Sequence, residues 1–145
     1  MKELNIKSEV TISQLPVLLN LHVRSEHLEK QLITLSKSGI QKVYVSIDGP
    51  RNKSDIASQE DIRKILKDYE SKFSLLKVRW MENNQGLALA MISNIDWFFS
   101  ANDYGVIFED DIDFESDALE FFVDGLRHIR YSPETLLVSG LQPRS

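Results

Sequence analysis

Three consecutive carboxylates, Glu109, Asp110 and Asp111, are the residues of this chain whose types and spacing point most directly to chemistry. They follow the short apolar run 106–108, which is typical of a strand buried on both faces. Three adjacent negative charges repel one another and resist removal from water, so stability alone does not favour them here. Mg²⁺ and Mn²⁺ prefer oxygen ligands and often bind one or two protein carboxylates together with substrate phosphates. We therefore expect a divalent cation at this point, bound by Asp111, the last of the three.

Other polar residues also follow apolar segments. Arg24 and Asp48 each come after such a segment, and Asn84 and Gly86 lie in a polar turn after another. The carboxylate of Asp48 can accept a hydrogen bond from the N3–H of uracil, and Arg24 can contact a base or a phosphate. Glu109 and Asp110 would then face ribose and sugar hydroxyls. A cation at Asp111 would stabilise the charge that develops on a leaving diphosphate. Together these residues predict a site for a nucleotide-diphospho-sugar.

The elements that must position these side chains alternate along the chain. Apolar and β-branched segments predict strands at residues 16–23, 42–47, 75–81, 106–108 and 136–139. Apolar residues at helical spacing predict intervening helices that begin near Ser25, Ser58, Leu87 and Ser116. This alternation predicts an α/β fold, a three-layer α/β/α Rossmann-like arrangement with a mostly parallel sheet flanked by helices. Because such sheets bind ligands at the carboxyl ends of their strands, we expect all the polar residues above at one rim.

Composition narrows the classes of protein to consider. The 145 residues, without an internal repeat or linker, are expected to form one domain (residues 16–145) preceded by an N-terminal arm (residues 1–15). A net charge of −5, with scattered Lys and Arg, argues against nucleic acid as a partner. Because there is no cysteine, disulfides and thiolate chemistry are excluded. The sequence shows no signal peptide or membrane-length apolar run, so we expect a cytoplasmic protein, with peripheral membrane attachment as the alternative.

The ordered set of segments resembles the donor-binding half of GT-A fold glycosyltransferases, most closely the N-acetylglucosaminyltransferase I type. The similar segments extend from about residue 17 to residue 142, nearly the whole chain. They are the strand ending in Arg24, the strand ending in Asp48, the run 106–112, the segment 113–122 with its paired phenylalanines, and residues 137–139. The turn and helix at residues 83–90 are similar to the Asn-x-Gly region of family-2 transferases.

This resemblance implies roles for the residues already named. Residues 109–111 would be the equivalent of the DxD motif, with Asp111 binding Mn²⁺, while Asp48 and Arg24 bind the nucleotide. The enzyme would transfer a sugar, with inversion, from a UDP-sugar to a hydroxyl acceptor on a glycan, a lipid-linked molecule or a protein. The family also has an acceptor-binding half and a catalytic base, both C-terminal to this region. The chain would therefore be the donor half, inactive alone, and the surface exposed by the absent half could self-associate.

Readings of other classes stay open on the residues alone. The chain could be a Mg²⁺-binding regulatory domain phosphorylated on Asp110 or Asp111, although receiver domains place paired acidic residues at the first strand. It could also be a nucleotide-binding module without catalysis. Asp48 could be an ordinary turn residue, Arg24 a solvated charge, and the turn before the third helix only a helix cap. His22 is interpreted as a core residue.

Overall fold

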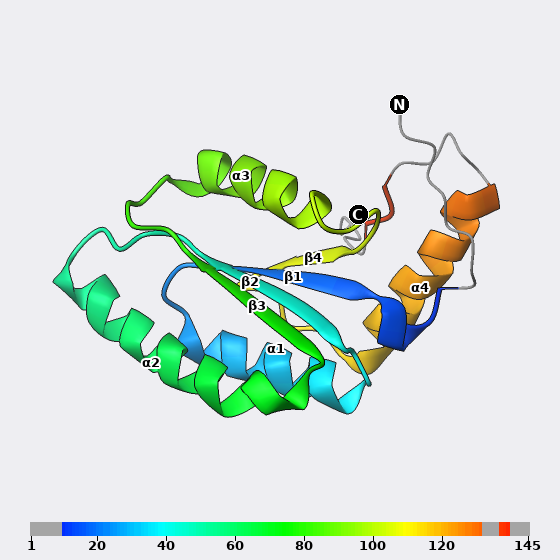
Figure 1. Ribbon diagram of the computed structural model, residues 1–145, viewed down its shortest axis with the longest axis horizontal. Coiled ribbons are helices and arrows are strands. Elements are labelled where there is room, and N and C mark those ends of the chain that lie inside the picture. The colour runs from blue at the N-terminus through cyan, green and yellow to red at the C-terminus, as the bar shows by residue number, and fades with distance from the viewer. Residues whose placement is uncertain (1–9, 132–136, 140–145) are drawn as a thin grey trace, which may run out of the picture.

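The computed structural model describes residues 10–131 and 137–139, in which strands and helices alternate around one sheet (Figure 1). In chain order the elements are η1 (Ile12–Gln14), β1 (Pro16–Leu21), α1 (Ser25–Lys37), β2 (Lys42–Ile47), α2 (Lys53–Tyr69), η2 (Glu70–Lys72), β3 (Leu75–Trp80), α3 (Leu87–Phe99), β4 (Val106–Glu109) and α4 (Ser116–Tyr131). The elements η1 and η2 are short 3₁₀ turns. The predicted α/β alternation is confirmed.

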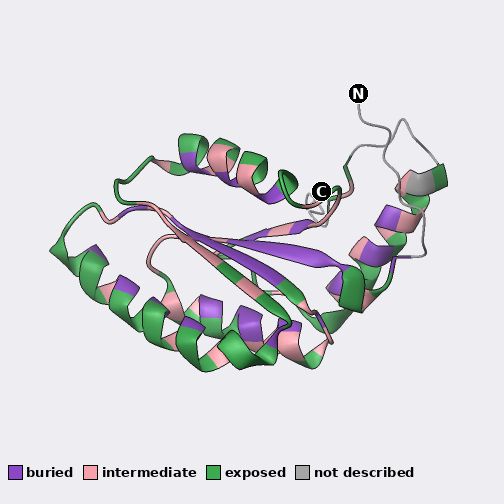
Figure 2. Ribbon diagram, in the orientation of Figure 1, coloured by how far each residue is buried: buried purple, intermediate pink, exposed green. Residues whose placement is uncertain are grey.

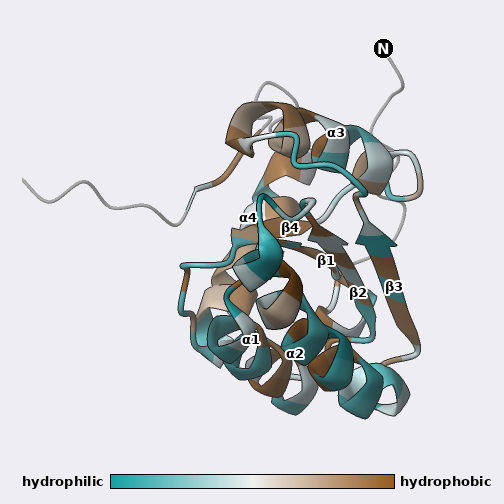
Figure 3. Ribbon diagram, turned by 90° about the vertical axis from the view of Figure 1, so that its left-hand side faces the viewer, coloured by the Kyte–Doolittle hydropathy of each residue, from teal (hydrophilic) through white to brown (hydrophobic). Residues whose placement is uncertain are grey.

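The four strands of the described residues form an all-parallel sheet in the order β3-β2-β1-β4. The chain moves from β1 outward to β2 and β3, and then returns to the other side of β1. Because crossovers between parallel strands are right-handed, this reversal places α3 on the opposite face from α1 and α2, as Figure 3 shows. Helix α4 packs beside α1. The sheet is therefore flanked by helices on both faces, as the sequence predicted.

The two faces of the sheet present different kinds of side chain. Towards α1, α2 and α4, all four strands contribute apolar residues to one large cluster, which includes Leu28, Leu32 and Leu119 of the helices. Towards α3 lies a smaller cluster of three buried residues, Leu18, Tyr44 and Phe98. The next row towards the carboxyl ends is polar and crosses all four strands in register: Arg79, Ser46, Asn20 and Glu109. We call these four residues the polar row. Figure 2 shows the buried residues along the strands and on the sheet-facing sides of the helices.

Each face also contains one of the two tryptophans of the chain. Trp80, the last residue of β3, packs against the large cluster, and the guanidinium carbon of Arg63 lies 3.7 Å from its ring centroid. Trp97 of α3 packs against the smaller cluster, and the guanidinium carbon of Arg79 lies 4.8 Å from its ring centroid. These distances place a cation over each indole ring.

The start of α2 differs from the sequence-based prediction. The helix begins at Lys53, not near Ser58, because Asn52 caps it: its side-chain oxygen accepts a hydrogen bond from the backbone N of Asp55 at 2.9 Å. The hydroxyl of Ser58 instead donates to the carbonyl of Ser54 inside the helix. The predicted pair of Ser58 with a carboxylate three residues later is therefore not the capping motif, since the same spacing occurs earlier, between Asn52 and Asp55.

The two ends of the described chain also depart from expectation. Residues 137–139 are not in a strand, and residue 136 lies outside the described part. Val138 instead lies next to Gly125 of α4, where the absence of a side chain leaves room for it. Strand β1 ends at Leu21, two residues earlier than predicted. Of the predicted N-terminal arm, residues 1–9 lie outside the described part, whereas Val10 and Leu15 are buried in the large cluster.

Candidate functional site

A cleft of about 370 Å³ opens at the carboxyl ends of β1, β2 and β4, next to the first turns of α3. It lies where the chain reverses its direction across the sheet, which is where open parallel sheets bind their ligands. The six residues predicted to bind a nucleotide-sugar all line it: Arg24, Asp48, Asn84, Gly86, Glu109 and Asp110. Asp111, the predicted metal ligand, is not among the lining residues and instead lies beside the cleft, in contact with Arg24.

One end of the cleft is formed by the acidic loop, residues 109–113. Glu109 is the last residue of β4, and the turn that follows is closed by a hydrogen bond from Ile112 N to Glu109 O of 3.2 Å. Arg24 Nη1 lies 3.7 Å from Asp110 Oδ1 and 3.8 Å from Asp111 Oδ2. These ion pairs are longer than direct hydrogen bonds, and the Arg24 side chain is 50% exposed. The acidic loop therefore keeps carboxylate oxygens that a second cation could use.

Side chains of helix α1 form hydrogen bonds to the acidic loop. Gln31, which is buried, donates from Nε2 to Glu109 O and to Ile112 O, both at 2.9 Å. His27, one turn earlier, has its Nδ1 3.3 Å from Asp113 Oδ1. Sequence reasoning did not single out these two residues for the site. A glutamine among the apolar positions of α1 was the available signal, but nothing in the sequence identified its partners.

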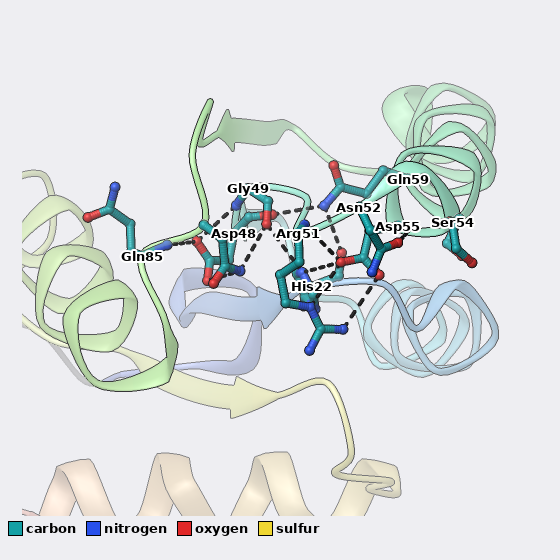
Figure 4. Close-up of polar contacts among 11 residues, drawn as sticks. His22, Asp48, Gly49, Arg51, Asn52, Ser54, Asp55, Gln59 and Gln85 are labelled. Atoms are coloured by element: carbon teal, nitrogen blue, oxygen red, sulfur yellow. Dashed lines mark hydrogen bonds and ion pairs between the residues drawn. The ribbon is translucent and has the colours of Figure 1, made fainter.

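The other end of the cleft is formed by two loops that bind each other, residues 48–51 and residues 83–86, which we call the paired loops. Asp48 joins them: Oδ1 accepts from Gly49 N and Gln85 N, both at 2.8 Å, and Oδ2 accepts from Asn84 Nδ2 at 3.0 Å (Figure 4). A Cβ atom on Gly49 would lie only 2.2 Å from the carbonyl carbon of Asn83, so this approach requires glycine. Asp48 is thus a structural turn residue. Since a carboxylate accepts about four hydrogen bonds, it keeps capacity for a ligand.

The paired loops include a cationic group. Arg51, which lines the cleft, donates to Asp55 Oδ2 from its backbone N at 2.9 Å and from Nε at 3.0 Å. The hydrogen bond from the Arg51 side chain is the main cause that lowers the pKa of Asp55, and the same bond raises the pKa of Arg51. His22 Nε2 lies 3.4 Å from Asp55 Oδ2 and 3.2 Å from Gly49 O (Figure 4). Both partners are acceptors, so Nε2 carries the ring proton.

The interpretation of His22 as a core residue was wrong. Its side chain is 21% exposed and lines the cleft, because β1 ends at Leu21 and residue 22 already belongs to the rim. Arg51 and Asp55 were also missed, although an arginine four residues before an aspartate at the start of a helix is a recognisable pairing. Gln59 of α2, which is buried, donates from Nε2 to Asp48 O at 2.8 Å and to His22 O at 3.1 Å.

The wall of the cleft next to α3 is built on the polar row. Asn94 of α3 is buried; its Oδ1 accepts from Ser46 Oγ at 2.7 Å and from Arg79, and its Nδ2 donates to Asn20 Oδ1 at 2.8 Å. Asn20 and Asn94 both line the cleft. Burial lowers the pKa of Arg79, whose hydrogen-bond partners Ser46 and Asn94 are neutral groups. The sequence shows a polar residue near the end of each strand. It does not show that the register of the strands places these four residues side by side.

The start of α3 lies at the edge of the cleft. Its N-cap is Gly86, at φ +75°, which has no side chain to accept from the first N–H groups of the helix. Gly86 and Leu87 line the cleft, so these N–H groups lie at its edge. The first turn of a helix binds anions through such N–H groups and through the helix dipole. The turn predicted from the sequence is therefore both a helix start and part of the cleft.

The carboxylates fit a cation that is shared with a ligand. In residues 10–131 and 137–139, no group of three His, Cys, Asp or Glu side chains is placed to hold a metal by itself. Asp110 and Asp111 are nevertheless close together, since both lie within 4 Å of one Arg24 nitrogen. One or two carboxylates, completed by water and substrate phosphate oxygens, are a common environment for Mg²⁺, so Asp111 could share a cation with a ligand.

Comparison of the chain with protein-family models, with curated proteins and with solved structures finds no match. Among the described residues, no helix has both the length and the apolar character needed to cross a bilayer.

Proposed function

We propose that this chain binds a nucleotide-diphospho-sugar, a UDP-sugar, through Mg²⁺ or Mn²⁺, and that it is the donor-binding part of a GT-A-like glycosyltransferase. The supporting observation is convergence: six residues chosen for this chemistry come from the ends of three strands and one turn, and all line one cleft. Both ends of the cleft also carry groups that suit such a ligand. Arg24, Glu109 and Asp110 lie at the acidic end, while Asp48, Asn84 and Arg51 lie at the paired loops.

The ligand would lie along the cleft with its diphosphate between the acidic loop and the start of α3. Asp111 would hold the cation, and the cation would neutralise charge on the departing diphosphate. Arg24 would contact the diphosphate as well, and the free N–H groups at the start of α3 would complete its binding. Glu109 and Asp110 would accept hydrogen bonds from ribose and sugar hydroxyls.

The nucleoside would lie at the paired loops. The remaining acceptor capacity of Asp48 suits the N3–H of uracil, and Asn84 lies next to it. The acceptor hydroxyl would approach from outside the cleft, and we assign its base to none of the described residues. The proposal is therefore one of donor binding, with transfer as the reaction that this binding serves.

Isothermal titration of the chain with UDP, in the presence of Mn²⁺ or of EDTA, tests the proposal. We expect Mn²⁺ to strengthen UDP binding, and Asp111→Ala to weaken the Mn²⁺-dependent part by at least about tenfold, since it removes a metal ligand. Glu115→Ala is the matched control: it removes an exposed carboxylate of the same segment outside the cleft and should change neither value.

Absence of UDP binding, or Mn²⁺-dependent binding that Asp111→Ala leaves unchanged, would contradict the proposal. Labelling of Asp110 or Asp111 by acetyl phosphate, without UDP binding, would identify the chain as a phosphoacceptor instead.

A further inference from the structure

Two buried glutamines have the same arrangement beneath the two ends of the cleft. Gln31 of α1 is 2% exposed and Gln59 of α2 is 6% exposed. Each donates from Nε2 to two backbone carbonyls of rim loops. Gln31 binds the carbonyls of Glu109 and Ile112 at 2.9 Å each, and Gln59 binds those of Asp48 and His22 at 2.8 and 3.1 Å.

Packing alone does not account for Gln31. It lies on the buried side of α1 with Leu28, Leu32 and Leu35, where an apolar residue would avoid the cost of removing an amide from water. Its Oε1 is buried and has no hydrogen-bond partner among the described residues, so even the amide that is present is only half satisfied. The contacts that the side chain does make are both to the acidic loop.

The position of those contacts indicates what they control. The carbonyls of Glu109 and Ile112 stand on either side of Asp110 and Asp111, so holding both fixes the turn that carries the two carboxylates. Gln59 in the same way fixes Asp48, whose carboxylate joins the paired loops, to the end of β1. Among the hydrogen bonds of the described residues, neither glutamine binds the loop that the other one holds.

We infer that Gln31 is the positioning residue of the metal end of the cleft, that Gln59 is the positioning residue of its nucleoside end, and that the two act independently. This inference rests on the proposed function, which assigns the cation to the acidic loop and the nucleoside to the paired loops. Gln31 sets the position of Asp111, the cation ligand, and Gln59 sets the position of Asp48, whose carboxylate meets the base.

Gln31→Met and Gln59→Met test the inference, because methionine keeps the unbranched shape of glutamine and removes its donors. Three quantities are measured on each protein: Mn²⁺ affinity at saturating UDP, by electron paramagnetic resonance; UDP affinity in EDTA, by titration; and the thermal unfolding midpoint. We expect Gln31→Met to weaken Mn²⁺ binding about 10- to 100-fold, as loss of groups that orient metal ligands does, and to leave UDP binding in EDTA within about twofold.

We expect the opposite result for Gln59→Met. UDP binding in EDTA should weaken about three- to tenfold, as for the loss of an ordinary hydrogen bond, while Mn²⁺ affinity is unchanged. Both midpoints should shift by less than about 5 °C. If each variant lowers both affinities in proportion to its midpoint, the glutamines are merely structural and the inference is wrong. Unchanged Mn²⁺ binding in Gln31→Met overturns it as well.

A ligand-free measurement separates this inference from the proposed function. Amide hydrogen exchange should increase at residues 110–113 in Gln31→Met, and at residues 49 and 85 in Gln59→Met. Each variant should leave exchange at the other loop unchanged. If the unmodified chain binds neither Mn²⁺ nor UDP, the proposed function fails, and the exchange pattern alone decides whether each glutamine positions its own loop. Should a methionine variant not fold, Gln31→Leu or Gln59→Leu takes its place in the same measurements.

Discussion

The two faces of the sheet differ in what holds them together. The face towards α1, α2 and α4 is covered by a continuous apolar cluster to which all four strands contribute. The face towards α3 has one small apolar cluster, followed by the polar row that borders the cleft. Helix packing on the first face can supply most of the stability, and this leaves the second face free to carry hydrogen-bonding groups at the ligand end.

The same strand serves both purposes because its side chains alternate. In β1, Val17, Leu19 and Leu21 face the large cluster, whereas Leu18 packs on α3 and Asn20 joins the polar row. The residues that stabilise the fold and those that border the cleft therefore alternate along one strand, and they differ in the face of the sheet to which their side chains point. Substitutions at neighbouring residues can test that separation.

The largest expected difference in the free energy of unfolding is between the variants Leu19→Ala and Leu18→Ala. Both side chains are fully buried and adjacent in β1. We expect Leu19→Ala to lower the free energy of unfolding by about 4 kcal/mol and Leu18→Ala by about 2 to 3 kcal/mol, because a single covering helix can settle into the space more easily than three. Chemical denaturation measures both values. An equal or larger loss for Leu18→Ala would show that the two faces are equally rigid.

The next effect concerns the polar row. Asn94→Ala should lower the free energy of unfolding by about 2 kcal/mol, because it leaves Ser46, Asn20 and Arg79 without their shared partner in a buried place. The exposed Asp96 of the same helix is the control, and Asp96→Ala should stay within about 0.5 kcal/mol. If Asn94→Ala costs no more than its control, the polar row contributes nothing to holding α3.

A smaller effect compares the cleft end of the sheet with the opposite end. Gly49→Ala forces its Cβ against the backbone of Asn83, so we expect a loss of about 1 to 3 kcal/mol and weaker UDP binding. Gly39 ends α1 at φ +84° with open space around it, so Gly39→Ala should cost about 1 kcal/mol through backbone strain alone. UDP binding should be unchanged in that variant. Equal UDP binding in both variants would mean that the paired loops do not shape the cleft.

The smallest effect is a pH dependence of stability at the start of α2. The folded chain lowers the pKa of Asp55, mainly through the hydrogen bond from Arg51. Its stabilisation is therefore complete above the ordinary aspartate pKa of about 4 and is lost as the pH falls through the lowered value. Amide exchange at the start of α2 should increase in that range, before it does in α3. Asp55→Asn should remove this pH dependence; its persistence would assign the effect to another group.

Much of the fold could be predicted because the determining patterns are local. The apolar run of β2 predicted both of its ends correctly, Gly39 lies just after the end of α1, and α4 begins at Ser116. Six residues of the cleft were also predictable, since the carboxyl ends of parallel strands must meet at one rim, although His22 and Arg51 were missed and Asp111 does not line it. Local patterns fail where they occur twice, and two cap-like pairs near the start of α2 led to the wrong boundary there.

The rest could not be predicted because it depends on contacts between distant segments. Gln31 binds carbonyls 78 and 81 residues further along the chain, and a backbone carbonyl has no identity in a sequence. Asn94 meets Ser46 and Asn20 only once α3 crosses the sheet. In each case a polar side chain is buried, which costs free energy, and only the three-dimensional arrangement showed which hydrogen bonds offset that cost.

The two tryptophans give this molecule an optical probe on each face of its sheet. Trp80 emits from the side of α1 and α2, close to the positive charge of Arg63, and Trp97 emits from beneath Arg79 on the side of α3. Replacing either one by phenylalanine leaves a single fluorophore that reports its own layer. Following both emissions during denaturation would therefore show directly whether the layers separate together or whether α3 departs first.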